Sequence, residues 1–122
     1  PFLTLLSMSV LAARAAGLVV LDGVYLELDN DQGFLDSCQQ GSELGFDGKT
    51  LLHPKTIAGA NAAFGPTSEE VAWAKKIIAA HGEAVRQGKG VLVVDGKFVE
   101  NLHVESAKQT LALADAIAAK RR

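Results

Sequence analysis

The run LVVLDG, at residues 18–23, decides the fold class of this chain. It is apolar without alternation and ends in Asp-Gly, which is typical of a strand buried on both faces. A second run of this kind, FDGKTLLHP at residues 46–54, ends at Pro54. Between the two, residues 33–44 have helical character and stop at Gly45. This strand–helix–strand order predicts an α/β fold with parallel strands.

Helices are expected on both sides of this unit. Residues 4–16 are rich in Leu, Ala and Met and predict a helix that Gly17 ends. After the second strand, residues 55–64 place Ile57 and Phe64 on one helical face. The first half of the chain therefore alternates helix and strand throughout.

The stretch of residues 1–21 carries one charge, Arg14, and suggests a membrane segment. A spanning helix needs about 20 uninterrupted apolar residues, whereas Arg14 and Gly17 interrupt this one. The sequence LAARAAG leaves a signal peptide open, although no positively charged segment precedes it. The change of pattern at Gly17 favours a buried helix followed by a buried strand.

The second half of the chain has a different pattern. Thr67 and Glu70, in GPTSEE, predict a capping box at the start of a long helix. VLVVDGKFV, at residues 91–99, predicts a hairpin around Asp95-Gly96, a pair suited to a type I′ turn. A final helix is expected over residues 102–121. The apolar face of the first of these helices is expected to carry Val71, Ala74, Ile78, His81 and Val85, and that of the last Val104, Ala107, Leu111, Ala114 and Ala118.

The number of parallel strands limits what this chain can form alone. Two parallel strands cannot close a sheet, and so small a sheet leaves long edges open. We therefore infer that residues 1–66 are the end of a larger α/β unit. Residues 67–122 contain no parallel strand and are interpreted as an appended element.

Composition excludes several classes of protein. The chain has 122 residues, of which 48% are hydrophobic and 21% charged, so disorder and coiled coil are not expected. The formal charge of −2 argues against nucleic acid as the main partner. Cys38 is the single cysteine and cannot form an internal disulfide, so a reducing compartment is expected. A buried, unreactive thiol is the expectation for this residue.

Two loop motifs fail on inspection. GSELGFDGKT resembles a phosphate loop, but Glu43 stands where the first Gly is required, and Lys49 leads into a strand. Lys49 is expected as a solvated lysine at a strand start. ELDNDQG resembles a calcium loop, but Gln32 replaces its essential Gly. Its acids, Asp29 and Asp31, are more simply helix caps.

The remaining candidates for chemistry lie at strand ends. No zinc site is expected, because the three histidines are far apart in sequence and Cys38 stands alone. Ligands of parallel α/β proteins bind at the carboxyl ends of strands, where Asp22 and His53 are found. Glu100 follows the hairpin and precedes the last helix. From the residues alone, Glu100 could be either a carboxylate that caps the last helix or a functional group.

Four blocks of this sequence together resemble a known family. They are AARAAG…LDGVY, LGFDGKTLLHPKTI, FGPTSEEVAWAKKII and GKGVLVVDGKFVENLHVESAKQTLALADAI. In order and spacing they resemble the citrate lyase beta-chain-like CoA-ester lyases of the HpcH/HpaI aldolase family, which include malyl-CoA and citramalyl-CoA lyases. The resemblance covers about residues 10–119 and corresponds to the carboxyl-terminal part of the family's chains.

This resemblance implies a fold and a reaction. Residues 1–66 would be the last strands and helices of a (β/α)₈ barrel of the TIM type. Residues 67–122 would be a helix–hairpin–helix extension that serves as a lid over a neighbouring subunit and in oligomerisation, commonly as a trimer or a multiple of it. The implied reaction cleaves a 3-hydroxyacyl-CoA, such as malyl-, citramalyl- or citryl-CoA, into a short acyl-CoA and a keto acid, or forms it from these two.

The resemblance also implies roles for residues and cofactors. Glu100 would be the catalytic carboxylate of the lid, where many family members have Asp. Thr50 and Leu51 would border the substrate, and with Asp22 and His53 they form the expected substrate-binding set. Mg²⁺ is expected as cofactor, with its Glu and Asp ligands on earlier strands that have no counterpart here, so no metal ligand is assigned. A cytoplasmic homo-oligomer without nucleic-acid or membrane partners is expected. The alternative is a catalytically incomplete fragment that acts only in oligomerisation.

Overall fold

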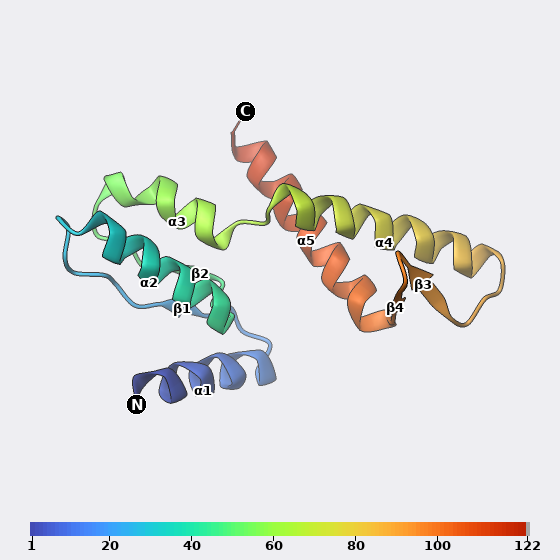
Figure 1. Cartoon of the computed structure of the whole chain (residues 1–122), viewed down its shortest axis with the longest axis horizontal. Coiled ribbons are helices and arrows are strands. Elements are labelled where there is room, and N and C mark those ends of the chain that lie inside the picture. Colours follow the sequence, from blue (N-terminus) through green and yellow to red (C-terminus); the bar gives the residue numbers. More distant parts are fainter. Residues whose placement is uncertain (122) are drawn as a thin grey trace. The chain divides into compact units, whose positions relative to one another are not determined.

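The computed structural model describes residues 1–121 and has two compact units, one of Pro1–Gly65 and one that begins at Pro66 (Figure 1). The first unit consists of α1 (Phe2–Ala15), β1 (Leu21–Asp22), α2 (Asp31–Leu44), β2 (Gly48–Lys49), the 3₁₀ helix η1 (Pro54–Thr56) and α3 (Ile57–Phe64). The second consists of α4 (Ser68–Arg86), β3 (Leu92–Val94), β4 (Lys97–Val99) and α5 (Asn101–Lys120). Their assignment to a barrel and to a lid stays a prediction.

The two strands of the first unit confirm the parallel arrangement. β1 pairs with β2 in parallel, with Leu21 opposite Gly48 and Asp22 opposite Lys49. Hydrogen bonds continue the pairing on either side, from the Asp47 amide to the Val20 carbonyl and from the Thr50 amide to the Asp22 carbonyl. The regular strands are nonetheless shorter than the expected runs at residues 18–23 and 46–54.

Burial of the first strand on both faces is not observed in this chain. Leu18, Val19 and Leu21 are 60%, 77% and 58% exposed. Within residues 1–121, β1 and β2 pair only with each other, so no further strand covers their outer edges. The prediction that residues 18–23 are buried on both faces was therefore wrong for the described chain. An apolar run is typical of a buried strand, but the described residues do not include the elements that would cover it.

The helical layer of the first unit lies beside this strand pair. The Asn30 side chain accepts a hydrogen bond from the Gly33 amide and begins α2, and Gly45 ends α2 in the left-handed conformation, at φ 99°. The expected end at Gly45 is thus confirmed. The N-cap is Asn30 rather than Asp29 or Asp31, but Asp31 lies in the first turn of α2, at the positive end of the helix dipole as expected. α2 and α3 lie side by side (Figure 1) around a core of Phe34, Cys38 and Ala60.

Arg14 connects α1 to this layer. Its guanidinium donates two hydrogen bonds to the carboxylate of Asp47, each of 2.8 Å, and a third to the Gly45 carbonyl. The Val20 amide donates to the same carboxylate at 2.9 Å. One ion pair therefore joins the end of α1, the end of α2 and the entry to β1.

The second unit is built on local signals that the structure confirms. Thr67 and Glu70 form the expected capping box at the start of α4. Asp95 and Gly96 have φ of 50° and 77°, as the turn between β3 and β4 requires. The core contains Ala74 and Ile77 of α4 and Val104 and Ala107 of α5.

The expected apolar face of α4 was partly wrong. Ile77 and Ala84 are buried, whereas Val85 is 63% exposed. The helix turns its Ala74–Ile77–Ala84 side inward because α5 and β3 both pack against α4 from that side. No helix within residues 1–121 combines the length and the apolarity that crossing a membrane requires.

The Arg14–Asp47 pair predicts acid sensitivity. Hydrogen bonds from Arg14 lower the pKa of the Asp47 carboxyl. A carboxyl whose pKa is lowered on folding contributes stability above its unfolded pKa, and this contribution is lost as the pH falls through the folded pKa. The pair is partly exposed, with side-chain exposures of 45% and 35%, so we expect a contribution of only about 1 kcal/mol.

The measurement is the free energy of unfolding of the full-length protein between about pH 6 and about pH 2. Asp47→Asn should be less stable than wild type at the upper end, and the two should converge in acid. Asp115→Asn serves as the control, because Asp115 is exposed and forms no ion pair within residues 1–121. A constant difference across the range would contradict the assignment.

Candidate functional site

A buried ion pair lies between the strands of the first unit and α2. Lys49 Nζ donates to Asp22 Oδ2 at 2.8 Å and to Ser37 Oγ at 2.9 Å. The side chain of Lys49 is 2% exposed and that of Asp22 is 14% exposed. The expectation of a solvated lysine was therefore wrong. The register places Lys49 directly opposite Asp22, on the face of the strands that α2 covers.

The surroundings of this pair are closely packed. A Cβ atom at Gly41 would lie 2.9 Å from Asp22 Oδ2 and 3.1 Å from the Phe64 ring, so the absence of a side chain there admits the carboxylate. Cys38 is fully buried in the same layer. Desolvation raises the pKa of its thiol. The charge of Lys49 opposes this rise and the charge of Asp22 adds to it, but burial dominates. The buried thiol expected from the sequence is confirmed, and its raised pKa disfavours the reactive thiolate.

The opposite face of the strand pair is open. A Cβ at Gly48 would lie 3.2 Å from Leu21 Cδ2, which places these two residues on one side. Since side chains alternate along a strand, Thr50 follows Gly48 on this side, opposite to Asp22 and Lys49. Thr50 is exposed. Its role in substrate binding stays a prediction, and its position on the open face is compatible with it.

The other expected substrate residues have local contacts. The Leu51 side chain packs against the Phe34–Cys38–Ala60 core. His53 is exposed, and its Nδ1 accepts a hydrogen bond of 3.1 Å from the Lys55 amide at the start of η1. Thr50, Leu51 and His53 lie on one segment, whereas Asp22 is turned toward α2. Their roles, like that of Asp22, stay predictions.

The acidic loop after β1 is held by its own side chains. The Tyr25 ring contacts Phe34 edge-on, with centroids 6.2 Å apart. Asn30 Nδ2 donates to the Tyr25 hydroxyl and to Glu27 Oε2, each at 3.1 Å. Lys55 Nζ donates to the Leu28 carbonyl. These contacts give the polar residues of the loop a structural role, and Lys55 connects the loop to η1.

Glu100 lies in the second unit, where β4 meets α5. It occupies the N-cap position of α5 and is exposed. Its amide donates a hydrogen bond of 2.9 Å to His103 Nδ1. The sequence placed Glu100 correctly between the hairpin and the helix. It did not indicate the contact with His103, although Glu100 and His103 have the spacing of a capping pair.

The described residues do not fit a magnesium site. Nowhere in residues 1–121 do three His, Cys, Asp or Glu side chains gather as metal ligands. Mg²⁺ prefers oxygen ligands in octahedral arrangement, and the carboxylate of Asp22 is occupied by Lys49. Residues 1–121 therefore do not form a complete ligand set for Mg²⁺.

Comparisons with known proteins find one matching family and several curated relatives. Residues 3–54 match the family described as HpcH/HpaI aldolase/citrate lyase. A (3S)-malyl-CoA thioesterase of Cereibacter sphaeroides is 53% identical over 116 residues, covering 95% of this chain and 41% of the relative. The citrate lyase subunit beta of Haemophilus influenzae is 43% identical over 103 residues, covering 84% and 35%.

A solved structure supports the same relationship. The protein CitE of Mycobacterium tuberculosis, in complex with magnesium, acetoacetate and coenzyme A, matches with a TM-score of 0.70 and 29% identity, covering 90% of this chain and 40% of that one. The α/β class expected from the sequence is thereby confirmed. The chain spans about two fifths of the length of the curated (3S)-malyl-CoA thioesterases that it matches.

The buried ion pair predicts a strong dependence on both partners. Lys49→Met leaves the carboxylate of Asp22 buried without its partner, and breaking a buried pair in this way costs about 3–5 kcal/mol. The double variant Asp22→Leu/Lys49→Met removes both charges and should recover much of this loss. Urea unfolding of the full-length protein measures both.

Lys55→Met is the matched control, because Lys55 is 42% exposed in its pair with Asp31 and its loss should cost less than about 1 kcal/mol. A Lys49→Met protein as stable as wild type would show that the pair is not buried in the assembled protein.

Proposed function

The chain belongs to the HpcH/HpaI aldolase/citrate lyase family, and from this membership we propose that its full-length protein is a carbon–carbon lyase of CoA esters. It would cleave a 3-hydroxyacyl-CoA, such as malyl-, citramalyl- or citryl-CoA, into a short acyl-CoA and a keto acid, or form it from these two. The observation that carries the proposal is the likeness of nearly the whole chain to enzymes of such thioesters, together with a CitE structure that holds acetoacetate and coenzyme A.

A second candidate reaction is hydrolysis of the thioester. The relative of Cereibacter sphaeroides that is 53% identical is named a (3S)-malyl-CoA thioesterase. It shares the substrate class with the lyase but releases free CoA. The alternative of a fragment that acts only in oligomerisation has no such support, because the matched relatives are enzymes.

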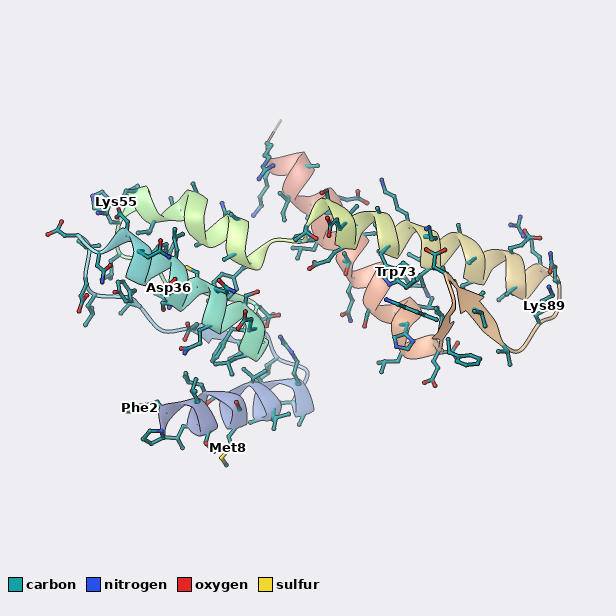
Figure 2. The ribbon with its side chains drawn as sticks, viewed as in Figure 1. Phe2, Met8, Asp36, Lys55, Trp73 and Lys89 are labelled. Carbon is teal, nitrogen blue, oxygen red and sulfur yellow. The ribbon has the colours of Figure 1, made fainter. Side chains whose placement is uncertain are left out.

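The proposed fold of the full-length protein is a (β/α)₈ barrel that residues 1–66 complete. Exposed apolar side chains support it. On α1, Phe2, Met8 and Leu11 are 78%, 60% and 69% exposed, and Figure 2 shows Phe2 and Met8 projecting from the side of α1 away from α2. Exposed apolar surface of this extent is typical of a surface that packs against other protein, here the remaining strands and helices of a barrel.

Glu100 is the group through which this chain would contribute to the reaction. We place it as a general acid or base that moves a proton to or from the α-carbon of the acyl-CoA. Its exposed position at the start of α5 supports its entry into a site on a neighbouring subunit of a homo-oligomer, a trimer or a multiple of one.

Thr50 would contribute from the first unit. Its position on the open face of the strand pair supports contact with the keto-acid end of the substrate. Mg²⁺ is the proposed cofactor, since CitE holds magnesium, and its ligands would come from residues outside this chain. The protein is proposed to be cytoplasmic and to bind neither nucleic acid nor membrane, in keeping with its slightly negative charge.

Substitution of Glu100 tests the proposal. In the full-length protein, Glu100→Gln keeps the size of the side chain but cannot take up the proton. We expect turnover of malyl-, citramalyl- or citryl-CoA to fall by about 10²–10⁴-fold, with Mg²⁺ binding unchanged. Keto acid and free CoA thiol are measured together: keto acid without thiol indicates the lyase, and thiol indicates the thioesterase.

Glu105→Gln is the control, because Glu105 lies on the same helix and pairs only with Lys108 in the described structure. Unchanged turnover in Glu100→Gln would remove Glu100 from the mechanism. Failure of the wild-type protein to turn over any of the three thioesters would remove the proposed function.

A further inference from the structure

The residues before Glu100 are firmly held. β4 leads directly into Glu100, and Val99 packs against the core of Ala74, Ile77, Val104 and Ala107. Two residues earlier, Lys97 Nζ lies 5.4 Å from the centroid of the Trp73 ring, a distance at which a cation and an aromatic face attract each other. Figure 2 shows Trp73 on the side of α4 toward the hairpin. The strand side of Glu100 is therefore fixed by packing.

The residues after Glu100 are held as well. Val104 is 3% exposed and belongs to the same core. Just before it, His103 accepts the hydrogen bond from the Glu100 amide at 2.9 Å. Because Nδ1 accepts this bond, the proton of a neutral imidazole ring lies on Nε2. The ring also lines the groove between α4 and α5, next to Glu70 and Trp73.

Between these two supports, the His103 contact is the one polar side-chain bond that the described structure gives to the backbone of Glu100. The amide of a residue at the N-cap lies outside the regular hydrogen bonding of the helix, so a side-chain acceptor decides its orientation. The direction of the backbone at residue 100 in turn sets where its carboxylate can reach.

We propose that His103 is a positioning residue for Glu100: by accepting the Glu100 amide, it fixes the direction in which the carboxylate leaves the hairpin–helix junction. This inference rests on the proposed function, in which Glu100 transfers a proton. Proton transfer requires heavy atoms within about 2.6–3.2 Å, and a displacement of about 1 Å can cost about a hundredfold in rate. His103 itself would touch neither substrate nor cofactor.

Two substitutions separate the acceptor from the bulk of the ring. His103→Leu fills a similar space without an acceptor, whereas His103→Gln restores an acceptor of the kind found three residues after the N-cap in capping boxes. In the full-length protein, we expect His103→Leu to lower kcat about tenfold or more with little change in KM. His103→Gln should recover most of the loss. Glu105→Gln again serves as the control on the same helix.

A second readout does not depend on activity. Hydrogen exchange of the Glu100 amide, followed by NMR in the same proteins, should be faster in His103→Leu than in wild type and close to wild type in His103→Gln. The unfolding midpoint is recorded for each variant. A kcat that falls in His103→Leu only in proportion to lost folded protein would overturn the proposal, as would failure of Gln to rescue.

The outcomes distinguish this inference from the proposed function. If Glu100→Gln loses turnover but His103→Leu keeps it, the positioning role fails and the proposed function stands. If Glu100→Gln keeps turnover, or the wild-type protein has none, the proposed function fails and the role of His103 falls with it. If exchange at the Glu100 amide is the same in all variants, the contact is absent in solution and the inference is wrong.

Discussion

The parallel register of β1 and β2, held by the buried pair of Asp22 and Lys49, is the constraint on which the first unit depends. A shift by one residue would exchange the two faces of a strand. It would move Lys49 from the layer under α2 to the open side and bring Gly48 beneath the helix. The ion pair therefore determines which side of the strands carries Thr50, and so which residues of this unit can meet a ligand. Gly41 is part of the same arrangement, because a side chain there would collide with Asp22.

Local chemistry made the helices and the hairpin predictable. Gly45 ends α2, Thr67 and Glu70 begin α4, and Asp95-Gly96 forms the turn as their conformational preferences require. The buried lysine was not predictable in this way. Whether Lys49 meets solvent or a carboxylate depends on a partner 27 residues away, and a pattern within one segment carries no information about register. The buried face of α4 was also predicted only in part, because the elements that pack against it, α5 and β3, come later in the sequence.

The candidate site was predictable only in its parts. The sequence placed Glu100 at the junction of hairpin and helix. The structure adds the contacts around that junction: Val99 packs against the core, Val104 is buried in it, and His103 accepts the amide of Glu100. The function of Glu100 depends on groups that these residues do not include. The proposed reaction rests on the relatives, of which this chain spans about two fifths, while the structure shows how the hairpin–helix junction holds the backbone of Glu100.

We propose that further strands of a barrel complete the strand pair of this chain. The decisive measurement is hydrogen exchange at the amides of Val19 and Leu21, which face away from β2 because the intervening Val20 bonds Asp47 on the β2 side, in the 122-residue chain and in the full-length protein. We expect rapid exchange of these amides in the chain alone and strong protection in the full-length protein, since an added strand would bond them. Equal protection in both would contradict it, because the two strands would then need no further partners.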